Sequence, residues 1–139
     1  MQKIKIITVG KMKRGPLKDL VDELRKRFGP YAKVKELVVN EHTAEILKEQ
    51  DVTIMLTEEG KTMGSMTFAK TLLTWSEHGQ RELTFVIAGP FGFNRDLLKH
   101  ADHVLSLSPM TFPHEMAYVI LLEQLYRAGT ILAGKTYHY

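Results

Sequence analysis

Short apolar runs rich in β-branched residues alternate along the chain with segments whose apolar residues follow helical spacing. Apolar runs with few polar positions are typical of strands buried on both faces, whereas apolar residues at every third or fourth position indicate helices packed on a sheet. The pattern predicts strands at residues 4–10, 34–39, 52–57, 83–89 and 103–108, and helices at 17–28, 43–50, 65–78, 94–100 and 113–128.

This alternation predicts an α/β fold, with a mostly parallel sheet and helices on both of its faces. The run 34–39 has a mixed pattern that also suits a strand at the sheet edge. Glycines mark three expected helix ends, at Gly29, Gly79 and Gly129. Because the 139 residues contain no internal repeat and no low-complexity linker, we expect one domain spanning 1–139.

The segments that follow the third, fourth and fifth strands form the candidate binding site. In a parallel sheet, ligands bind beyond the carboxyl ends of the strands. These segments are rich in Gly, Pro and small polar residues, which bring backbone groups close to a small molecule. Any one of them alone is better explained as a turn, but the three together favour a pocket. They read TEEGKTMGS (57–65), GPFGFN (89–94) and SPMTFPH (108–114).

The last predicted helix is apolar around most of its circumference, which implies burial on more than one side. A sheet covers one face of a helix, so a second subunit is one explanation, and a central core helix in a monomer is the other. We predict a homodimer. Glu123 and Arg127 stand four residues apart and can pair on the remaining stripe. The apolar residues are Met116, Val119, Ile120, Leu121, Leu122, Leu125, Tyr126 and Ala128.

The net charge of +3 is unevenly distributed along the chain. Residues 1–35 contain 11 Lys and Arg against three acidic residues, a net charge of +8, and the remainder carries −5. Such a segment suggests a surface that attracts a polyanion such as nucleic acid, although an ordinary solvated helix is the alternative. The first apolar run is too short for a signal-peptide core or a membrane span, so we expect a cytoplasmic protein that does not enter the membrane.

Several common chemistries lack their sequence motifs. The absence of cysteine excludes disulfides, thiolate metal sites and a cysteine nucleophile. The glycine fingerprints of dinucleotide-binding and P-loop proteins and the G-x-S-x-G elbow of serine hydrolases do not occur. His114-Glu115 begins an H-E-x-x-H motif, but Tyr118 occupies the position of the second histidine. His100 and His103 have no further ligands near them, so no metal is predicted.

Four segments, FVIAGPFGF, LSLSPMTFPHEM, LLEQLYRA and the terminal YHY, carry a resemblance to a known family. They resemble the 23S ribosomal RNA pseudouridine N3-methyltransferases, the H-type enzymes of the SPOUT superfamily. With IKIITVGKMK and RFGPY, the resemblance spans essentially the whole chain. It implies a C-terminal trefoil knot, a homodimer, S-adenosylmethionine as cofactor, and 23S rRNA in the 70S ribosome as substrate. Apolar patterning would not predict a knot, because threaded chains are nearly absent from proteins.

Candidate site residues follow from the resemblance and from their chemistry. In the tail, His138 can act as a base near neutral pH and Tyr137 can stack on a nucleobase. Arg127 can bind phosphate or stabilise an imide anion. We interpret His114 as structural, since the preceding Pro113 suits a helix start. The resemblance implies that the cofactor contacts Leu56, Ala88, Gly89, Leu107, Ser108, Pro109, Met110, Thr111 and Phe112.

The chain differs from the family pattern at three positions. Ala88 stands where the family usually has glycine, Tyr118 where relatives carry arginine, and Tyr139 where the tail commonly ends in a basic residue. Two other functions remain open at this point. A non-catalytic RNA-binding domain would explain the charge distribution but not the three loops, and a nucleotide-binding α/β module would lack its glycine fingerprint.

Overall fold

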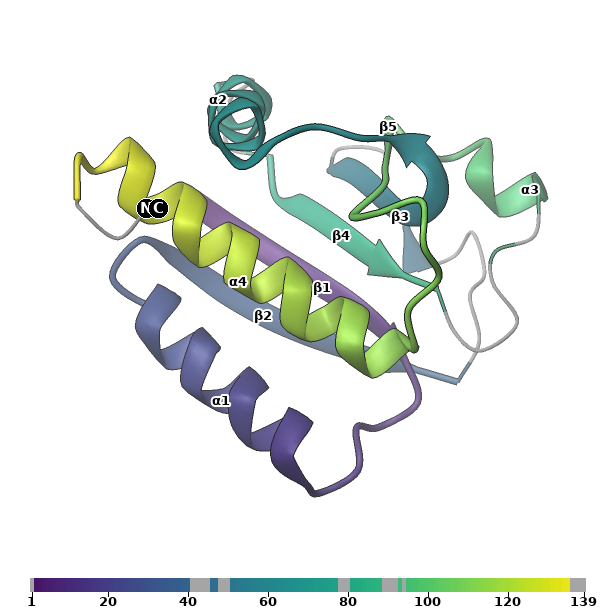
Figure 1. The fold of residues 1–139 in the computed structure, drawn as a ribbon. Coiled ribbons are helices and arrows are strands. Elements are labelled where there is room, and N and C mark those ends of the chain that lie inside the picture. Colours follow the sequence, from purple (N-terminus) through teal and green to yellow (C-terminus); the bar gives the residue numbers. More distant parts are fainter. Residues whose placement is uncertain are drawn as a thin grey trace.

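The computed structural model describes residues 2–40, 46–47, 51–77, 81–88, 93 and 95–135. Strands and helices alternate as predicted, except that no helix is described between β2 and β3 (Figure 1). Most of the predicted helix 43–50 and Gly79 lie outside the described residues. The elements are β1 (Gln2–Val9), α1 (Pro16–Phe28), β2 (Ala32–Val39), β3 (Val52–Lys61), α2 (Ser65–Ser76), β4 (Leu83–Ile87), α3 (Arg95–Leu98), β5 (His103–Leu105) and α4 (His114–Leu132).

The strands form one sheet in the order β2-β1-β4-β3-β5, and every pairing is parallel. The predicted α/β fold is therefore confirmed. The mixed pattern of residues 34–39 is explained by the place of β2 at the sheet edge, where half of its residues are exposed. Because all strands run in the same direction, their carboxyl ends lie at one edge, and the segments after β3, β4 and β5 begin there.

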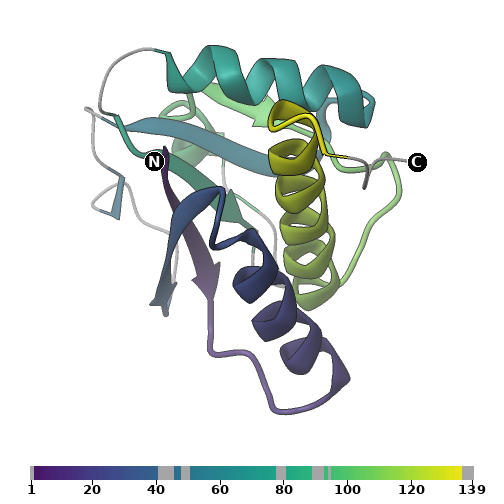
Figure 2. The same cartoon turned by 90° about the vertical axis from the view of Figure 1, so that its left-hand side faces the viewer.

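Helices α1, α2 and α4 pack on one face of the sheet (Figure 2). Ile4 and Ile6 of β1 point into this main core, and Ile7 points to the opposite face, as the alternation of side chains along a strand requires. On that opposite face, α3 contributes Leu97 to a smaller apolar cluster. Burial on both faces explains the nearly continuous apolar runs of the central strands.

Helix α4 lies between α1 and α2 above the sheet (Figure 1). The sheet and the two flanking helices account for most of its apolar circumference within one chain, although Met116 and Leu132 stay exposed. A second subunit is therefore not needed to bury this helix, and the homodimer stays a prediction. Among the described helices, none is long and apolar enough to cross a membrane. The buried residues of α4 are Tyr118, Val119, Leu121, Leu122, Leu125, Ala128, Gly129 and Thr130.

The prediction that Gly129 ends the last helix is wrong. Helix α4 continues to Leu132, and the chain turns at Gly134, whose φ is 70°. Gly129 instead lies against the ring of Tyr31, and a Cβ atom at this position would be 2.8 Å from Cγ of that ring. Glycine is therefore present at residue 129 because two segments approach closely, not because the chain turns.

Strand β3 is longer than predicted because its end returns to β5. The two strands pair as far as Leu56 and Leu105, lose register, and pair again where Lys61 meets Leu105. The backbone N–H of Ser106 donates to the Lys61 carbonyl at 2.9 Å. A Cβ on Gly60 would lie 2.7 Å from the Leu105 carbonyl carbon, so the crossing requires glycine. The trefoil knot stays a prediction, because the segment after β4 lies largely outside the described residues.

Candidate functional site

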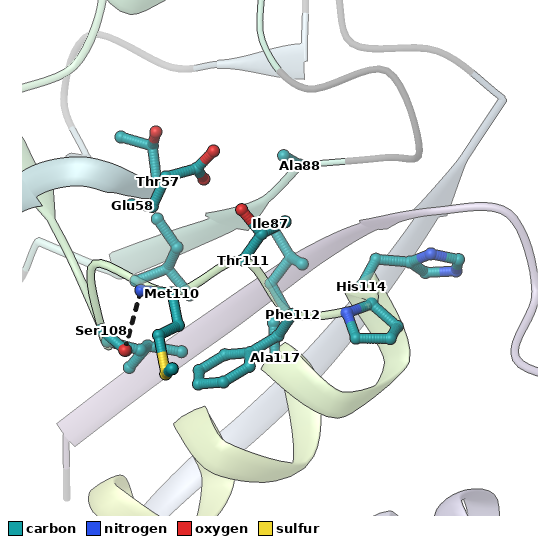
Figure 3. A pocket seen from close by; sticks show the side chains of 13 residues that line it. Thr57, Glu58, Ile87, Ala88, Ser108, Met110, Thr111, Phe112, His114 and Ala117 are labelled. Atoms are coloured by element: carbon teal, nitrogen blue, oxygen red, sulfur yellow. Dashed lines mark hydrogen bonds between the residues drawn. The ribbon is translucent and has the colours of Figure 1, made fainter.

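A cavity of about 820 Å³ opens where the carboxyl ends of β3, β4 and β5 converge (Figure 3). Its volume lies in the range of pockets that enclose small molecules and cofactors, roughly 300–1,000 Å³. Three strand ends and the first turn of α4 supply the wall. The lining residues are Leu56, Thr57 and Glu58 of β3, Ile87 and Ala88 at the end of β4, Leu107, Ser108, Met110, Thr111 and Phe112 after β5, and Pro113, His114 and Ala117 at the start of α4.

The segment between β5 and α4 forms one side of this cavity. The Ser108 hydroxyl accepts a hydrogen bond of 3.0 Å from the Met110 backbone N–H, which fixes a tight turn. Met110 is 75% exposed. Pro113 ends the segment and suits the start of α4, since its ring fixes φ near the helical value and it lacks the N–H that a first turn leaves unpaired.

The excursion of β3 forms another part of the wall. Between the two pairings with Leu105, the strand leaves register, and this stretch places Thr57 and Glu58 in the cavity wall. Glu58 is a carboxylate in a wall that is otherwise mostly apolar, and the hydroxyls of Thr57, Ser108 and Thr111 add hydrogen-bonding groups. An apolar wall with a few polar groups binds a ring system and fixes its polar substituents.

The cavity gathers most of the residues that the resemblance assigns to the cofactor. Pro109 belongs to the same segment but is not part of the lining, and Gly89 lies outside the described residues. Glu58 lies in the predicted segment 57–65, although it was not named individually, and Ala117 was missed; Ala117 lies four residues after Pro113, a spacing that could have revealed it. The predicted residues found in the wall are Leu56, Ala88, Leu107, Ser108, Met110, Thr111 and Phe112, and their binding of a cofactor stays a prediction.

The catalytic candidates are not brought to the cavity within the described part of the chain. Arg127 lies ten residues beyond Ala117 on α4, which is about 15 Å along the helix axis at 1.5 Å per residue. Its Nη2 and Nε donate to Glu123 Oε1 and Oε2 at 2.8 and 3.3 Å, so the predicted pair forms. Tyr137 and His138 lie outside the described residues.

His114 stands at the boundary between the main cavity and a small cleft. In this cleft the Tyr118 hydroxyl donates to Glu36 Oε2 at 2.6 Å. Burial, and then this hydrogen bond, raise the pKa of Tyr118 above its ordinary value. No group of three or more His, Asp or Glu side chains able to hold a metal occurs among the described residues. The cleft is lined by Thr8, Gly10, Met12, Glu36, His114, Glu115 and Tyr118.

A family model described as predicted SPOUT methyltransferase matches residues 2–138. The chain belongs to the SPOUT methyltransferase family. This SPOUT chain is also similar to the ribosomal RNA large subunit methyltransferase H of Maridesulfovibrio salexigens, with 36% identity over 155 aligned positions that cover 100% of the chain and 99% of the relative. The resemblance carried by the sequence motifs is thereby confirmed.

A solved structure shares the fold of this SPOUT chain. It is described as a probable methylase family protein from Haemophilus influenzae Rd KW20, and it superposes with a TM-score of 0.64 at 10% identity. The match covers 99% of this chain and 71% of the other. At such low identity, the likeness concerns the fold alone.

Proposed function

We propose that this SPOUT chain transfers a methyl group from S-adenosylmethionine to N3 of a pseudouridine in 23S rRNA, acting in the cytoplasm on the assembled 70S ribosome. The observation that carries the proposal is the convergence of three strand ends on one mostly apolar cavity. The full-length similarity to a ribosomal RNA large subunit methyltransferase H supports the choice of substrate. A purely RNA-binding domain would have no use for such a cavity.

The cavity wall fits S-adenosylmethionine chemically. Apolar side chains such as Ile87, Leu107 and Phe112 suit the adenine ring and the carbon chain of the methionine part. The Glu58 carboxylate and the Thr111 hydroxyl suit the positively charged sulfonium and amino groups and the ribose hydroxyls. When bound, the cofactor supplies an electrophilic methyl group. The chain itself has to hold the acceptor nitrogen in line with that methyl group and exclude water.

The acceptor N3 of pseudouridine carries an imide proton that has to leave. In our proposal His138 takes this proton, Tyr137 stacks on the base, and Arg127 stabilises the developing negative charge. Arg127 lies about 15 Å along α4 from the cavity of its own chain. It can therefore act in catalysis only on the cavity of a second chain. We therefore propose a homodimer in which each cavity is completed by Arg127 and the tail of the partner. Exposed apolar residues on α2 and α4, including Met66, Leu73 and Leu132, support an interface there.

Methyl transfer from labelled S-adenosylmethionine to ribosomes that lack the modification tests the proposed activity. We expect label at one pseudouridine of 23S rRNA, more label with 70S ribosomes than with free 23S rRNA, and heat on titration with S-adenosylmethionine. Binding of ribosomes without cofactor heat and without label would instead establish the RNA-binding alternative.

Mixed dimers test whether the partner completes the cavity. Arg127→Ala removes the cation and Ala117→Phe blocks the cavity, so each variant alone should be inactive. Mixed in equal amounts, they should regain about a quarter of wild-type activity, because half of the dimers are mixed and each of these has one intact site. If Arg127 acted on the cavity of its own chain, the mixture would stay inactive.

Deleting residues 137–139 should also abolish methyl transfer. Transfer at the wild-type rate by that deletion variant would refute the role of the tail.

A further inference from the structure

The fold divides the basic N-terminal segment into cations that are paired and cations that are exposed. On α1, Lys18 Nζ lies 2.6 Å from Asp22 Oδ1, and Arg27 Nε lies 3.0 Å from Glu23 Oε1. These pairs neutralise much of the outer face of the helix. Helix α1 has Lys18, Arg25, Lys26 and Arg27 against Asp19, Asp22 and Glu23, a net charge of +1, so it attracts a polyanion less strongly than its basic residues alone suggest.

Most of the remaining exposed cations form two groups in different places. The loop cations are Lys11, Lys13 and Arg14, in the segment that joins β1 to α1, and none of them makes an ion pair with another described residue. The strand-start cations are Lys3, Lys33 and Lys35, in the first halves of β1 and β2; all three are exposed, and Lys35 also lies 3.9 Å from Glu82 Oε2. The groups carry the same formal charge, so they can be compared directly.

The loop that carries the first group is held in a defined shape. The Gly10 backbone N–H donates to the Val39 carbonyl at 2.9 Å, and the φ of Gly10 is 77°. Met12 packs against the main core while its neighbours Lys11 and Lys13 are exposed. The inward methionine thus anchors the loop and leaves the two lysines facing solvent.

The loop cations lie at the end of the sheet where the carboxyl ends of the parallel strands and the cavity are found. Strand β1 runs parallel to β4, so its carboxyl end belongs to the same edge as the cavity. Gly10 and Met12 line the small cleft together with His114, which also lines the main cavity. The strand-start cations lie at the opposite edge, since Lys3 pairs in register with Lys33 and is separated from Val9 by about 20 Å of strand.

We propose that Lys11, Lys13 and Arg14 bind the RNA phosphates that flank the target nucleotide, and that the strand-start cations do not take part. A base enters the cavity only if its backbone runs along the cavity edge, and that edge is where the loop cations lie. Phosphate contacts of this kind position a nucleic acid without reading its sequence. The inference rests on the proposed function, because it assumes that RNA is the substrate of the cavity.

Two matched triple variants test the proposal. Lys11→Gln, Lys13→Gln and Arg14→Gln are combined in one, and Lys3→Gln, Lys33→Gln and Lys35→Gln in the other; both remove three exposed positive charges. For the loop variant we expect KM for ribosomes to rise roughly tenfold or more and the salt dependence of binding to weaken by about three units of slope, about one per lost contact. The strand-start variant should stay within about twofold of wild type in KM.

Ribosome binding measured without any methyl donor separates this inference from the proposed function. Equal weakening by both variants would mean that net charge rather than position governs binding, and would overturn the proposal, as would unchanged binding by both. The wild type could bind ribosomes through the loop cations and yet transfer no methyl group. That result would refute the proposed function but support the proposal that the loop cations bind RNA. A retained heat of S-adenosylmethionine binding shows that both variants are folded.

Discussion

The hydroxyl of Tyr118 on α4 donates a 2.6 Å hydrogen bond to Oε2 of Glu36 on β2. Tyr118 is 3% exposed, and the bond joins the start of α4 to the edge strand of the sheet. The family resemblance places an arginine at this position. In this chain the side chain is therefore used for an internal contact rather than for binding an anion.

Replacing Tyr118 with phenylalanine tests the energetic value of this contact. The change keeps the ring but removes the donor, so the Glu36 carboxylate loses its partner. We expect the free energy of unfolding at pH 7 to fall by about 1–2 kcal/mol, measured by urea denaturation. An unchanged free energy of unfolding would show that water replaces the hydroxyl without loss.

The raised pKa of Tyr118 also predicts a pH dependence. Above about pH 10 the tyrosine ionises in the unfolded chain but keeps its proton in the folded one. The unfolded state then binds fewer protons, so stability falls as pH rises above that value. The wild type should lose more stability between pH 8 and pH 11 than Tyr118→Phe. An equal loss of stability with rising pH in the two proteins would contradict a raised pKa of Tyr118 in the folded chain.

A methyl group on Gly60 should disrupt the crossing of β3 and β5. The Cβ of Gly60→Ala would lie 2.7 Å from the carbonyl carbon and 2.9 Å from the nitrogen of Leu105, and backbone atoms cannot rotate away. We expect a loss of about 2–3 kcal/mol in the free energy of unfolding. Gly64→Ala is the control, because nothing lies within 4 Å of its added atom, and its effect should stay within about 1 kcal/mol.

Lys5 is buried between two carboxylates, and removing it should be costly. Its Nζ lies 3.4 Å from both Asp51 Oδ2 and Glu82 Oε1, and its side chain is 7% exposed. Lys5→Met leaves two poorly solvated negative charges together, so we expect a loss of about 3 kcal/mol in unfolding free energy. Lys35 lies 3.9 Å from Glu82 with its side chain 70% exposed, and Lys35→Met should cost under about 1 kcal/mol. Similar losses of unfolding free energy in Lys5→Met and Lys35→Met would refute the claim that the burial of Lys5 between two carboxylates makes its removal costly.

Ala117→Phe should fill the cavity from its α4 side. Ala117 belongs to the cavity wall, so a phenyl ring there competes with the adenine or methionine part of the cofactor. We expect the affinity for S-adenosylmethionine to fall roughly a hundredfold or more, measured by calorimetry, while the melting temperature changes little because the ring enters open space. Wild-type affinity in this variant would place the cofactor elsewhere.

Much of the fold and of the cavity could be predicted from local sequence. Three of the five apolar runs became the central strands β1, β3 and β4, which are buried on both faces and need apolar side chains at nearly every position, and the other two became the edge strands β2 and β5. The segment 108–114 is predicted to form part of the site because small and turn-forming residues follow a strand, and its Met110 and Thr111 line the cavity. Predictions of this kind succeed because they depend on residues that are neighbours in the chain.

The glycines show where such reasoning fails. Gly129 was expected to end a helix, but it lies inside α4 against Tyr31, a residue almost a hundred positions away. Gly60 gave no local sign of the crossing with Leu105. Both requirements come from the approach of distant segments, which periodicity does not record.

The sequence by itself determined the described elements, the α/β class, the uneven charge and the two segments, 57–65 and 108–114, that contribute residues to the cavity wall, because each follows from short-range spacing and composition. The tertiary structure decided that α1 and α2 enclose α4, that Arg127 lies far along α4 from the cavity, and that the basic segment divides between opposite sheet edges. These relationships depend on the strand order β2-β1-β4-β3-β5. That order arises from the packing of residues distant in sequence, since parallel strands of similar apolar pattern can be arranged in many ways.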